Sequence, residues 1–124
     1  MIQGVVQSGL GQGDSFTQLE WVRQQFRDKI GFDPYPGTLN LRVQDRNGLV
    51  GLRAERGIRI EPGAPGFCAA KCFRVKIGES VAGAWIIPDV PGYPDDLVEL
   101  MAPVCLRDTL GLESGDLVPV RLLK

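Results

Sequence analysis

Short runs of β-prone residues, separated by turns rich in glycine and proline, follow one another along most of the chain. The 124 residues include 16 glycines and 9 prolines. Strands are expected at 2–6, 38–43, 67–77, 81–87, 97–102 and 117–123, and 57–61 is a weaker candidate for a short strand. The regular alternation of strands and helices that marks a parallel α/β sheet is missing. The chain is therefore predicted to be mainly β, a closed barrel of about six strands with one principal helix.

That helix is indicated by an apolar stripe at helical spacing, formed by Leu19, Val22, Phe26 and Ile30. Gly31 follows the stripe, where a C-terminal cap belongs. Thr17 and Glu20 have the spacing of a capping box, which would satisfy free N–H groups at the start of the helix. Residues 44–56 are mostly polar and are expected to form a loop, as is the proline-containing segment 89–95.

Length and charge narrow the classes of function. A chain of 124 residues suits a single domain, predicted to span 1–124, and we expect it to be a monomer. Its 14 lysines and arginines against 15 aspartates and glutamates leave a net charge of -1, which gives no general attraction to nucleic acid. No run is long enough to span a membrane, and the first residues lack the basic region of a signal peptide. We expect a cytoplasmic protein without nucleic-acid or membrane partners.

Histidine is absent from the sequence. An enzyme of this composition would use carboxylates, hydroxyls, amides, backbone groups and a bound metal ion instead of a histidine base. The three cysteines, Cys68, Cys72 and Cys105, are odd in number and form no CxxC motif. Buried free thiols are therefore expected, rather than disulfides or a zinc site.

Three alternating glycines follow the first expected strand, in the segment Gly9-Leu10-Gly11-Gln12-Gly13. Glycines allow the backbone to approach a ligand closely and to direct several N–H groups at an anion. A position between a strand and a helix suits a phosphate group. No Gly-Lys-Ser/Thr follows, so the segment is not a Walker A loop. Taken alone, the motif favours a structural turn, with a phosphate-binding loop as the alternative.

Thr38 and Asn40 lie two residues apart at the start of the strand expected over 38–43, so their side chains point to the same side. A hydroxyl and an amide oxygen on one face can contact Mg²⁺, which keeps several waters and takes few protein ligands. The alternative is a polar strand start beside a turn, where threonine and asparagine are common. The pair alone favours that alternative.

Glu99 interrupts the apolar strand expected over 97–102. Both faces of that strand are otherwise apolar, so a partly buried carboxylate is expected. Burial costs free energy unless the carboxylate is paired or bound, and it raises proton affinity, which suits a general base. A structural ion pair with Arg107 or Arg74 is the equally weighted alternative.

Residues 102–107 form a turn led by Pro103 and ending at Arg107. Its backbone groups could contact the edge of a base, and a guanidinium group suits phosphate. Taken alone, the segment favours a plain loop with one solvated arginine.

Together these segments resemble the archaeal-type CTP-dependent riboflavin kinases. The matching stretches run in order along nearly the whole chain, at 4–13, 31–41, 83–84, 88, 99–103, 106–107 and 115–118. The most specific stretch is Pro-Tyr-Pro-Gly-Thr-Leu-Asn-Leu at 34–41.

The resemblance implies a six-stranded cradle-loop barrel that transfers the γ-phosphate of CTP to the ribityl 5′-hydroxyl of riboflavin, giving FMN and CDP. It also implies that Thr38 and Asn40 hold Mg²⁺, and that Glu99 contacts the ribityl end of the flavin and is the candidate base. The implied nucleotide-binding residues are Gly9, Leu10, Gly11, Gln12, Gly13 and Asp14 at the phosphates, and Val104, Cys105, Leu106 and Arg107 at the cytidine.

The sequence departs from the family pattern on the acceptor side. Pro91 stands at the substrate-binding position where a hydroxyl residue is expected, and Gly92 and Pro94 make its loop unusual. Two alternatives therefore stay open. One is a related kinase acting on another small hydroxyl acceptor, and the other is a nucleotide- or flavin-binding module without catalysis.

Overall fold

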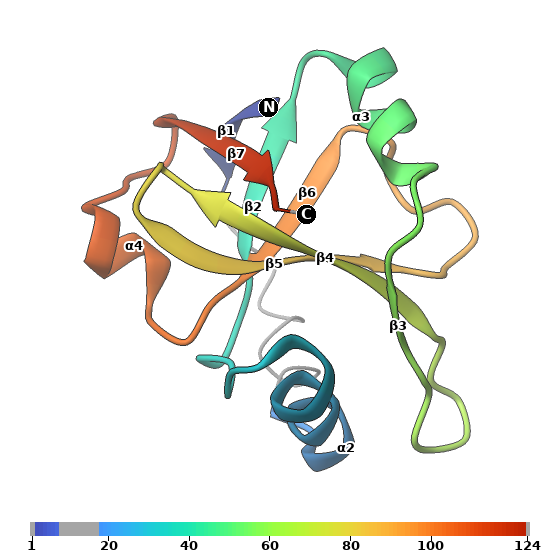
Figure 1. Cartoon of the computed structure of the whole chain (residues 1–124). Helices are drawn as coiled ribbons and strands as arrows, with labels where there is room; N and C mark the ends of the chain where they lie inside the picture. Colours follow the sequence, from blue (N-terminus) through green and yellow to red (C-terminus); the bar gives the residue numbers. More distant parts are fainter. Residues whose placement is uncertain (1, 8–17, 124) are drawn as a thin grey trace.

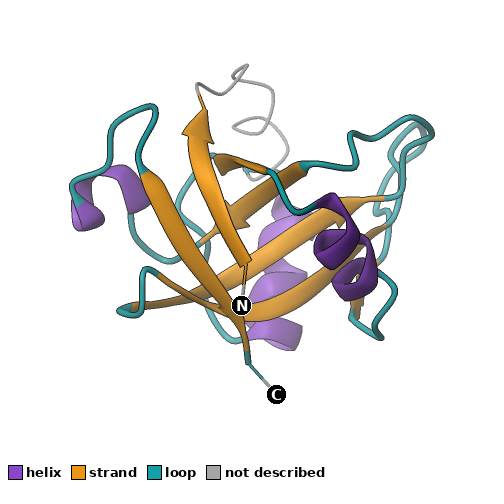
Figure 2. Ribbon diagram, turned by 90° about the horizontal axis from the view of Figure 1, so that it is seen from above, coloured by secondary structure: helices purple, strands orange, loops and turns teal. Residues whose placement is uncertain are grey.

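The computed structural model describes residues 2–7 and 18–123, and its strands form a closed barrel. The strands are β1 (Ile2–Gln7), β2 (Leu39–Val43), β3 (Ile58–Ile60), β4 (Ala70–Ile77), β5 (Val81–Pro88), β6 (Leu97–Met101) and β7 (Leu117–Leu122). They pair in the order β3-β4-β5-β6-β2-β1-β7, and β4 also pairs with β7. This last pairing closes the sheet into a six-stranded antiparallel barrel and leaves β3 outside it (Figure 1 and Figure 2). The predicted fold class is confirmed.

The interior of the barrel is filled by the inward-facing residues of its strands. Burial alternates along β1 and β2, as it must where only one face of a strand meets the core. Trp85, Leu41 and Leu100 have no solvent exposure and belong to one core cluster that draws on all six barrel strands. Residues two apart therefore share a face, and the residues between them lie on the outside of the barrel.

A helical layer covers part of this outside. Helix α2 (Glu20–Gln25) continues as a π-helical turn, η1 (Phe26–Ile30), and Gly31 ends it with a φ of 106°. Figure 1 shows this layer below the barrel. The apolar stripe is confirmed, because its buried members pack in a second core cluster against the outer faces of β3–β6; these members are Val22, Phe26 and Ile30. Leu19 is the N-cap residue and makes no side-chain cap bond, while Thr17 of the predicted capping box lies outside the described residues.

The prediction of a loop over 44–56 is wrong, because α3 (Arg46–Arg53) lies there. The side chain of Asp45 caps this helix by accepting a hydrogen bond of 3.0 Å from the backbone N–H of Gly48. Leu49 is fully buried in the barrel core cluster. Gly48 and Gly51 lower the helix propensity of the segment. The helix is therefore held by its cap and by tertiary packing rather than by local preference.

All the helices are short. The last one, α4 (Leu106–Leu110), stands between β6 and β7 and ends at Gly111 with a φ of 63°. None of the helices in residues 2–7 and 18–123 is long and apolar enough to cross a membrane.

The start of β4 and the burial of the cysteines differ in part from the sequence predictions. β4 begins at Ala70 and not at Phe67, whose ring instead meets Trp21 edge-on at 5.4 Å between ring centroids. Cys72 is buried as expected, and burial raises the pKa of its thiol to about 12. Cys68 and Cys105 are only half-buried.

At Gly83 the backbone of β5 lies close to the end of β6. A Cβ atom there would lie 2.5 Å from the backbone oxygen of Met101 and 2.8 Å from Cδ1 of Ile77. We expect Gly83→Ala to lower the free energy of unfolding by about 1–3 kcal/mol, because backbone cannot yield as a side chain can. Chemical denaturation measures this difference.

Gly51→Ala is the matched control for that substitution. No atom lies within 4 Å of a Cβ at Gly51, which is exposed in α3. The alanine is expected to stabilise the protein by about 0.5–1 kcal/mol through helix propensity. Equal effects of the two substitutions would contradict the close approach of β5 and β6.

Candidate functional site

Three polar side chains meet on the outer face of the barrel, at the start of β2 and the middle of β6. The register of these strands places Asn40 opposite Glu99. The Thr38 hydroxyl oxygen lies 3.0 Å from Oδ1 of Asn40 and 3.2 Å from Oε1 of Glu99. All three residues are half-buried. The expectation that Thr38 and Asn40 share a side is confirmed, and so is the partial burial of Glu99.

This group of three is rich in acceptors. The Thr38 hydroxyl has one proton, yet both Oδ1 of Asn40 and Oε1 of Glu99 lie within hydrogen-bonding distance of it. At any moment one of the two acceptors therefore lacks that donor. Such a cluster of hard oxygen atoms, one of them carboxylate, attracts a hard cation or a hydroxyl group of a ligand.

The other carboxylate oxygen of Glu99 is held by a phenol. The Tyr93 hydroxyl donates a hydrogen bond of 2.5 Å to Oε2 of Glu99. Burial raises the pKa of Tyr93 far above its usual range, and the bond to Glu99 raises it further. Tyr93 therefore keeps its proton at any physiological pH and acts as a donor toward this carboxylate.

Within residues 2–7 and 18–123, the structural ion pair considered for Glu99 is not formed. Arg107 donates instead to the backbone oxygen of Gln7 at 2.9 Å. Arg74 donates to the backbone oxygen of Lys29 at 2.6 Å. In the part of the chain that the structure describes, no lysine or arginine forms a salt bridge with Glu99.

Tyr93 was not predicted as a site residue from the sequence, although the two residues before it are typical of a turn. Pro91 and Gly92 are the central residues of a turn closed by a 3.1 Å bond from the Tyr93 N–H to the Val90 oxygen, and Gly92 has a φ of 79°. Proline followed by glycine in this conformation is typical of a type II turn. The motif predicts the turn but not that the next side chain reaches Glu99. Pro91 itself is exposed, and its contact with a substrate stays a prediction.

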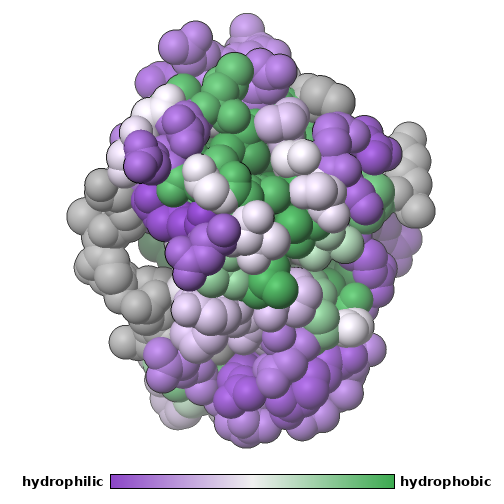
Figure 3. Space-filling view, turned by 90° about the vertical axis from the view of Figure 1, so that its left-hand side faces the viewer, coloured by the Kyte–Doolittle hydropathy of each residue, from purple (hydrophilic) through white to green (hydrophobic). Residues whose placement is uncertain are grey.

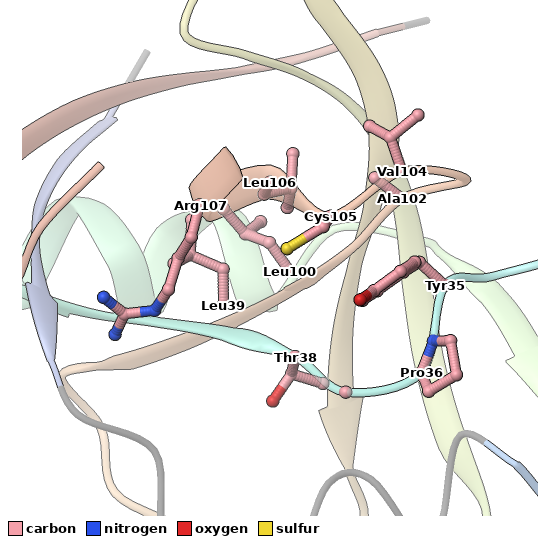
Figure 4. A pocket seen from close by; sticks show the side chains of 11 residues that line it. Tyr35, Pro36, Thr38, Leu39, Leu100, Ala102, Val104, Cys105, Leu106 and Arg107 are labelled. Atoms are coloured by element: carbon pink, nitrogen blue, oxygen red, sulfur yellow. The ribbon is translucent and has the colours of Figure 1, made fainter. Parts of the chain in front are cut away.

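A pocket of about 170 Å³ opens beside Thr38. It is lined by the loop before β2, by the ends of β2 and β6, and by the turn into α4, through Tyr35, Pro36, Gly37, Thr38, Leu39, Leu100, Ala102, Val104, Cys105, Leu106 and Arg107. In Figure 4, Arg107 and Tyr35 stand at opposite ends of the pocket, with Thr38 and Cys105 between them. Figure 3 looks onto the side of the molecule that carries α4, where apolar surface is surrounded by polar residues.

This pocket unites two segments that the sequence analysis treated separately. Thr38 belongs to the predicted metal pair, and Val104, Cys105, Leu106 and Arg107 form the predicted cytidine segment. Their shared pocket places them at one site. The other lining residues lie in the stretches 31–41 and 99–103, which matched the family pattern, but none of them was predicted to bind a ligand.

The predicted phosphate loop cannot be compared with this geometry, because residues 9–14 lie outside the described residues. Its neighbour in the sequence is placed. Gln7, the last residue of β1, accepts the hydrogen bond from Arg107. The end of the strand that leads into the glycine segment thus lies against the pocket.

The donor set of the site fits magnesium better than a transition metal. Among the described residues, no group of three or more histidine, cysteine, aspartate or glutamate side chains could hold a metal ion. Thr38 and Asn40 instead offer neutral oxygen atoms beside one carboxylate. Magnesium commonly takes few protein oxygens and completes its shell with water and substrate phosphates.

Comparisons with a family model and with individual proteins point to the same family. The family model CTP-dep_RFKase, described as domain of unknown function DUF120, matches residues 6–122. A protein named riboflavin kinase from Archaeoglobus fulgidus is 44% identical over 127 residues, which cover 98% of this chain. Similar proteins of the same name come from Methanocella arvoryzae, at 42% identity over 98% of this chain, and from Aeropyrum pernix, at 41% identity over 99%.

These relatives differ in length. The chain spans 54% of the Archaeoglobus protein and 56% of the Methanocella protein, about half of each. It spans 96% of the Aeropyrum protein.

The raised pKa of the half-buried Tyr93 phenol predicts that the free energy of unfolding falls at alkaline pH. The unfolded chain releases a tyrosine proton near pH 10, whereas folded Tyr93 retains it, so rising pH favours the unfolded state. The wild type is expected to lose more free energy of unfolding than Tyr93→Phe between about pH 9 and about pH 11. Denaturant titrations of both proteins measure the difference. Equal losses would contradict the protonated, buried phenol.

Proposed function

The chain belongs to the CTP-dependent riboflavin kinase family, and from this premise we propose that it phosphorylates riboflavin. The proposed reaction transfers the γ-phosphate of CTP to the ribityl 5′-hydroxyl, giving FMN and CDP. The proposal rests on family membership together with one structural observation. The oxygen atoms of Thr38, Asn40 and Glu99 converge at the edge of a pocket that nucleotide-binding residues are expected to line.

Phosphoryl transfer requires little covalent chemistry from the protein. The protein mainly positions the two substrates and compensates the negative charge of the phosphates. The 5′-hydroxyl oxygen of the acceptor forms a bond to the γ-phosphorus, and the bond from that phosphorus to the β–γ bridging oxygen breaks. The electron pair of the broken bond leaves with CDP. The hydroxyl proton passes to the carboxylate of Glu99, which is our candidate base. No histidine is needed at any step.

Thr38 and Asn40 are the residues that would hold Mg²⁺. When bound, the ion neutralises phosphate charge and so favours transfer. The two side chains reach the site from one strand edge, and Glu99 reaches it from the neighbouring strand. Asn40 and Glu99 stand opposite each other on paired strands of the closed barrel, so their backbones are held in place without help from a substrate.

The cytidine is proposed to occupy the pocket beside Thr38. Val104, Cys105 and Leu106 offer backbone groups and small or apolar side chains there, which suits recognition of a base edge by the backbone. Arg107 uses part of its guanidinium on the Gln7 oxygen and has further N–H groups for phosphate. Residues 9–14 are proposed to surround the phosphates, as a glycine-rich segment can. We place the reaction in the cytoplasm and expect the protein to act as a monomer.

The direct test is an assay of the purified protein with riboflavin, Mg²⁺ and each of CTP, ATP, GTP and UTP in turn, with FMN separated by chromatography. We expect FMN to form mainly with CTP. If no nucleotide yields FMN, riboflavin is not the acceptor and the proposal is wrong. Retained CTP binding would then favour another small hydroxyl acceptor or a binding module.

The metal assignment predicts the effect of Asn40→Ala. Removing the amide oxygen should raise the Mg²⁺ concentration needed for half-maximal turnover by about tenfold or more. Titration of Mg²⁺ at saturating CTP and riboflavin measures this change.

Asn47→Ala is the matched control, since Asn47 is exposed on α3 and belongs to a different element from the site residues. It should leave the Mg²⁺ requirement unchanged. An unchanged requirement in Asn40→Ala would remove Asn40 from the metal site.

A further inference from the structure

The loop between β5 and β6 carries Tyr93 to Glu99 by a defined path. The Pro91-Gly92 turn reverses the chain and places Tyr93 at its end. The Tyr93 ring is half-buried, and its hydroxyl meets Oε2 of Glu99. A turn with a proline and a positive-φ glycine has few alternative conformations, so the direction of the tyrosine is set by the backbone.

Arg53, the last residue of α3, binds the backbone of this loop. One guanidinium nitrogen donates 2.8 Å bonds to the backbone oxygens of Pro94 and Leu97. The guanidinium carbon lies 5.4 Å from the centroid of the Tyr93 ring, within the range of a cation–π contact. A single side chain therefore holds the loop backbone on both sides of residues 95–96 and covers the tyrosine ring.

Further contacts fix the end of the same loop. Arg42 of β2 forms a 2.7 Å ion pair with Asp96, whose backbone oxygen accepts a 2.8 Å bond from Val43. Arg46 of α3 reaches Asp96 at 3.4 Å and Asp95 at 3.8 Å, but its side chain is 62% exposed, so these pairs contribute little. The loop is thus attached to the barrel wall and to α3, with Arg53 as the attachment nearest to Tyr93.

Each carboxylate oxygen of Glu99 therefore has its own hydrogen-bonding neighbour. Oε2 is occupied by the Tyr93 donor, and Oε1 lies on the side of Thr38. The terminal torsion of a glutamate is broad, so without the phenol only the Thr38 hydroxyl would limit the rotation of the Glu99 carboxylate. A carboxylate that accepts a proton must meet the acceptor hydroxyl at a defined distance and angle.

We propose that Tyr93, held by Arg53, is a positioning residue for Glu99, which it keeps turned with Oε1 toward the acceptor hydroxyl. The inference rests on the proposed kinase function and extends it. It also gives α3 a role in the site, because the last residue of this helix hydrogen-bonds to the loop between β5 and β6. Neither Tyr93 nor Arg53 is proposed to touch the reacting atoms.

A double-mutant cycle tests this role, with wild type, Tyr93→Phe, Glu99→Gln and the double variant. Steady-state kinetics give kcat and the KM values for CTP and riboflavin, and thermal unfolding monitors the fold. Tyr93→Phe is expected to lower kcat by about ten- to a hundredfold, the effect of losing one hydrogen bond to a charged group, with the KM for CTP unchanged. In the Glu99→Gln background the same substitution should change kcat by less than about twofold, because residues that act through one group are not additive.

Arg53→Met and Arg46→Met form a matched pair on α3. Arg53→Met retains an apolar stem but loses the carbonyl bonds and the charge over the ring, and we expect kcat to fall in the same sense as for Tyr93→Phe. Arg46→Met removes one positive charge from the same helix without touching Tyr93, and kcat should stay at the wild-type value.

Two results would overturn the inference. One is a Tyr93→Phe variant whose kcat lies within about twofold of the wild type, and the other is an equal fold loss in the wild-type and Glu99→Gln backgrounds. The failure of the proposed function is a separate result, since it would show as an inactive wild type with every nucleotide.

Discussion

The antiparallel register of β2 and β6 is the constraint on which the site depends. It sets Leu39 opposite Leu100 inside the barrel and Asn40 opposite Glu99 outside it. A slip of one residue would turn Glu99 into the core and expose the leucines, because strand side chains alternate between the two faces. The burial that stabilises the barrel therefore also decides which polar groups meet on its outer face.

The site combines rigid and local parts. Asn40 and Glu99 come from strands that the β4–β7 pairing holds in a closed barrel, so their backbones are positioned before a substrate binds. Tyr93 and the pocket residues come from loops, which suit the shape of particular ligands. The attachments made by Arg53 and Arg107 tie those loops to the scaffold. This division explains how a chain without histidine could present an ordered set of groups for the proposed phosphoryl transfer.

Much of the fold follows from short-range patterns. Alternating apolar residues predicted the strands, and the same alternation predicted that Thr38 and Asn40 share a face. Glu99 was noticeable because its neighbours are apolar. Its partner Tyr93 could not be predicted, since the contact depends on the path of a loop and on a helix elsewhere in the chain. Helix α3 was not predicted, because its two glycines lower its helix propensity. The helix is stabilised by the Asp45 cap and by burial of Leu49 in the barrel core, and the burial of Leu49 depends on the tertiary fold.

We propose that phosphoryl transfer takes place where the oxygen atoms of Thr38, Asn40 and Glu99 meet. A crystal structure of the protein with CDP, Mg²⁺ and FMN tests it most directly. We expect the metal ion at Thr38 and Asn40, the FMN phosphate next to Glu99, and the cytidine in the pocket lined by Val104–Arg107. A flavin bound away from Glu99, or a metal ion held by other residues, would contradict it.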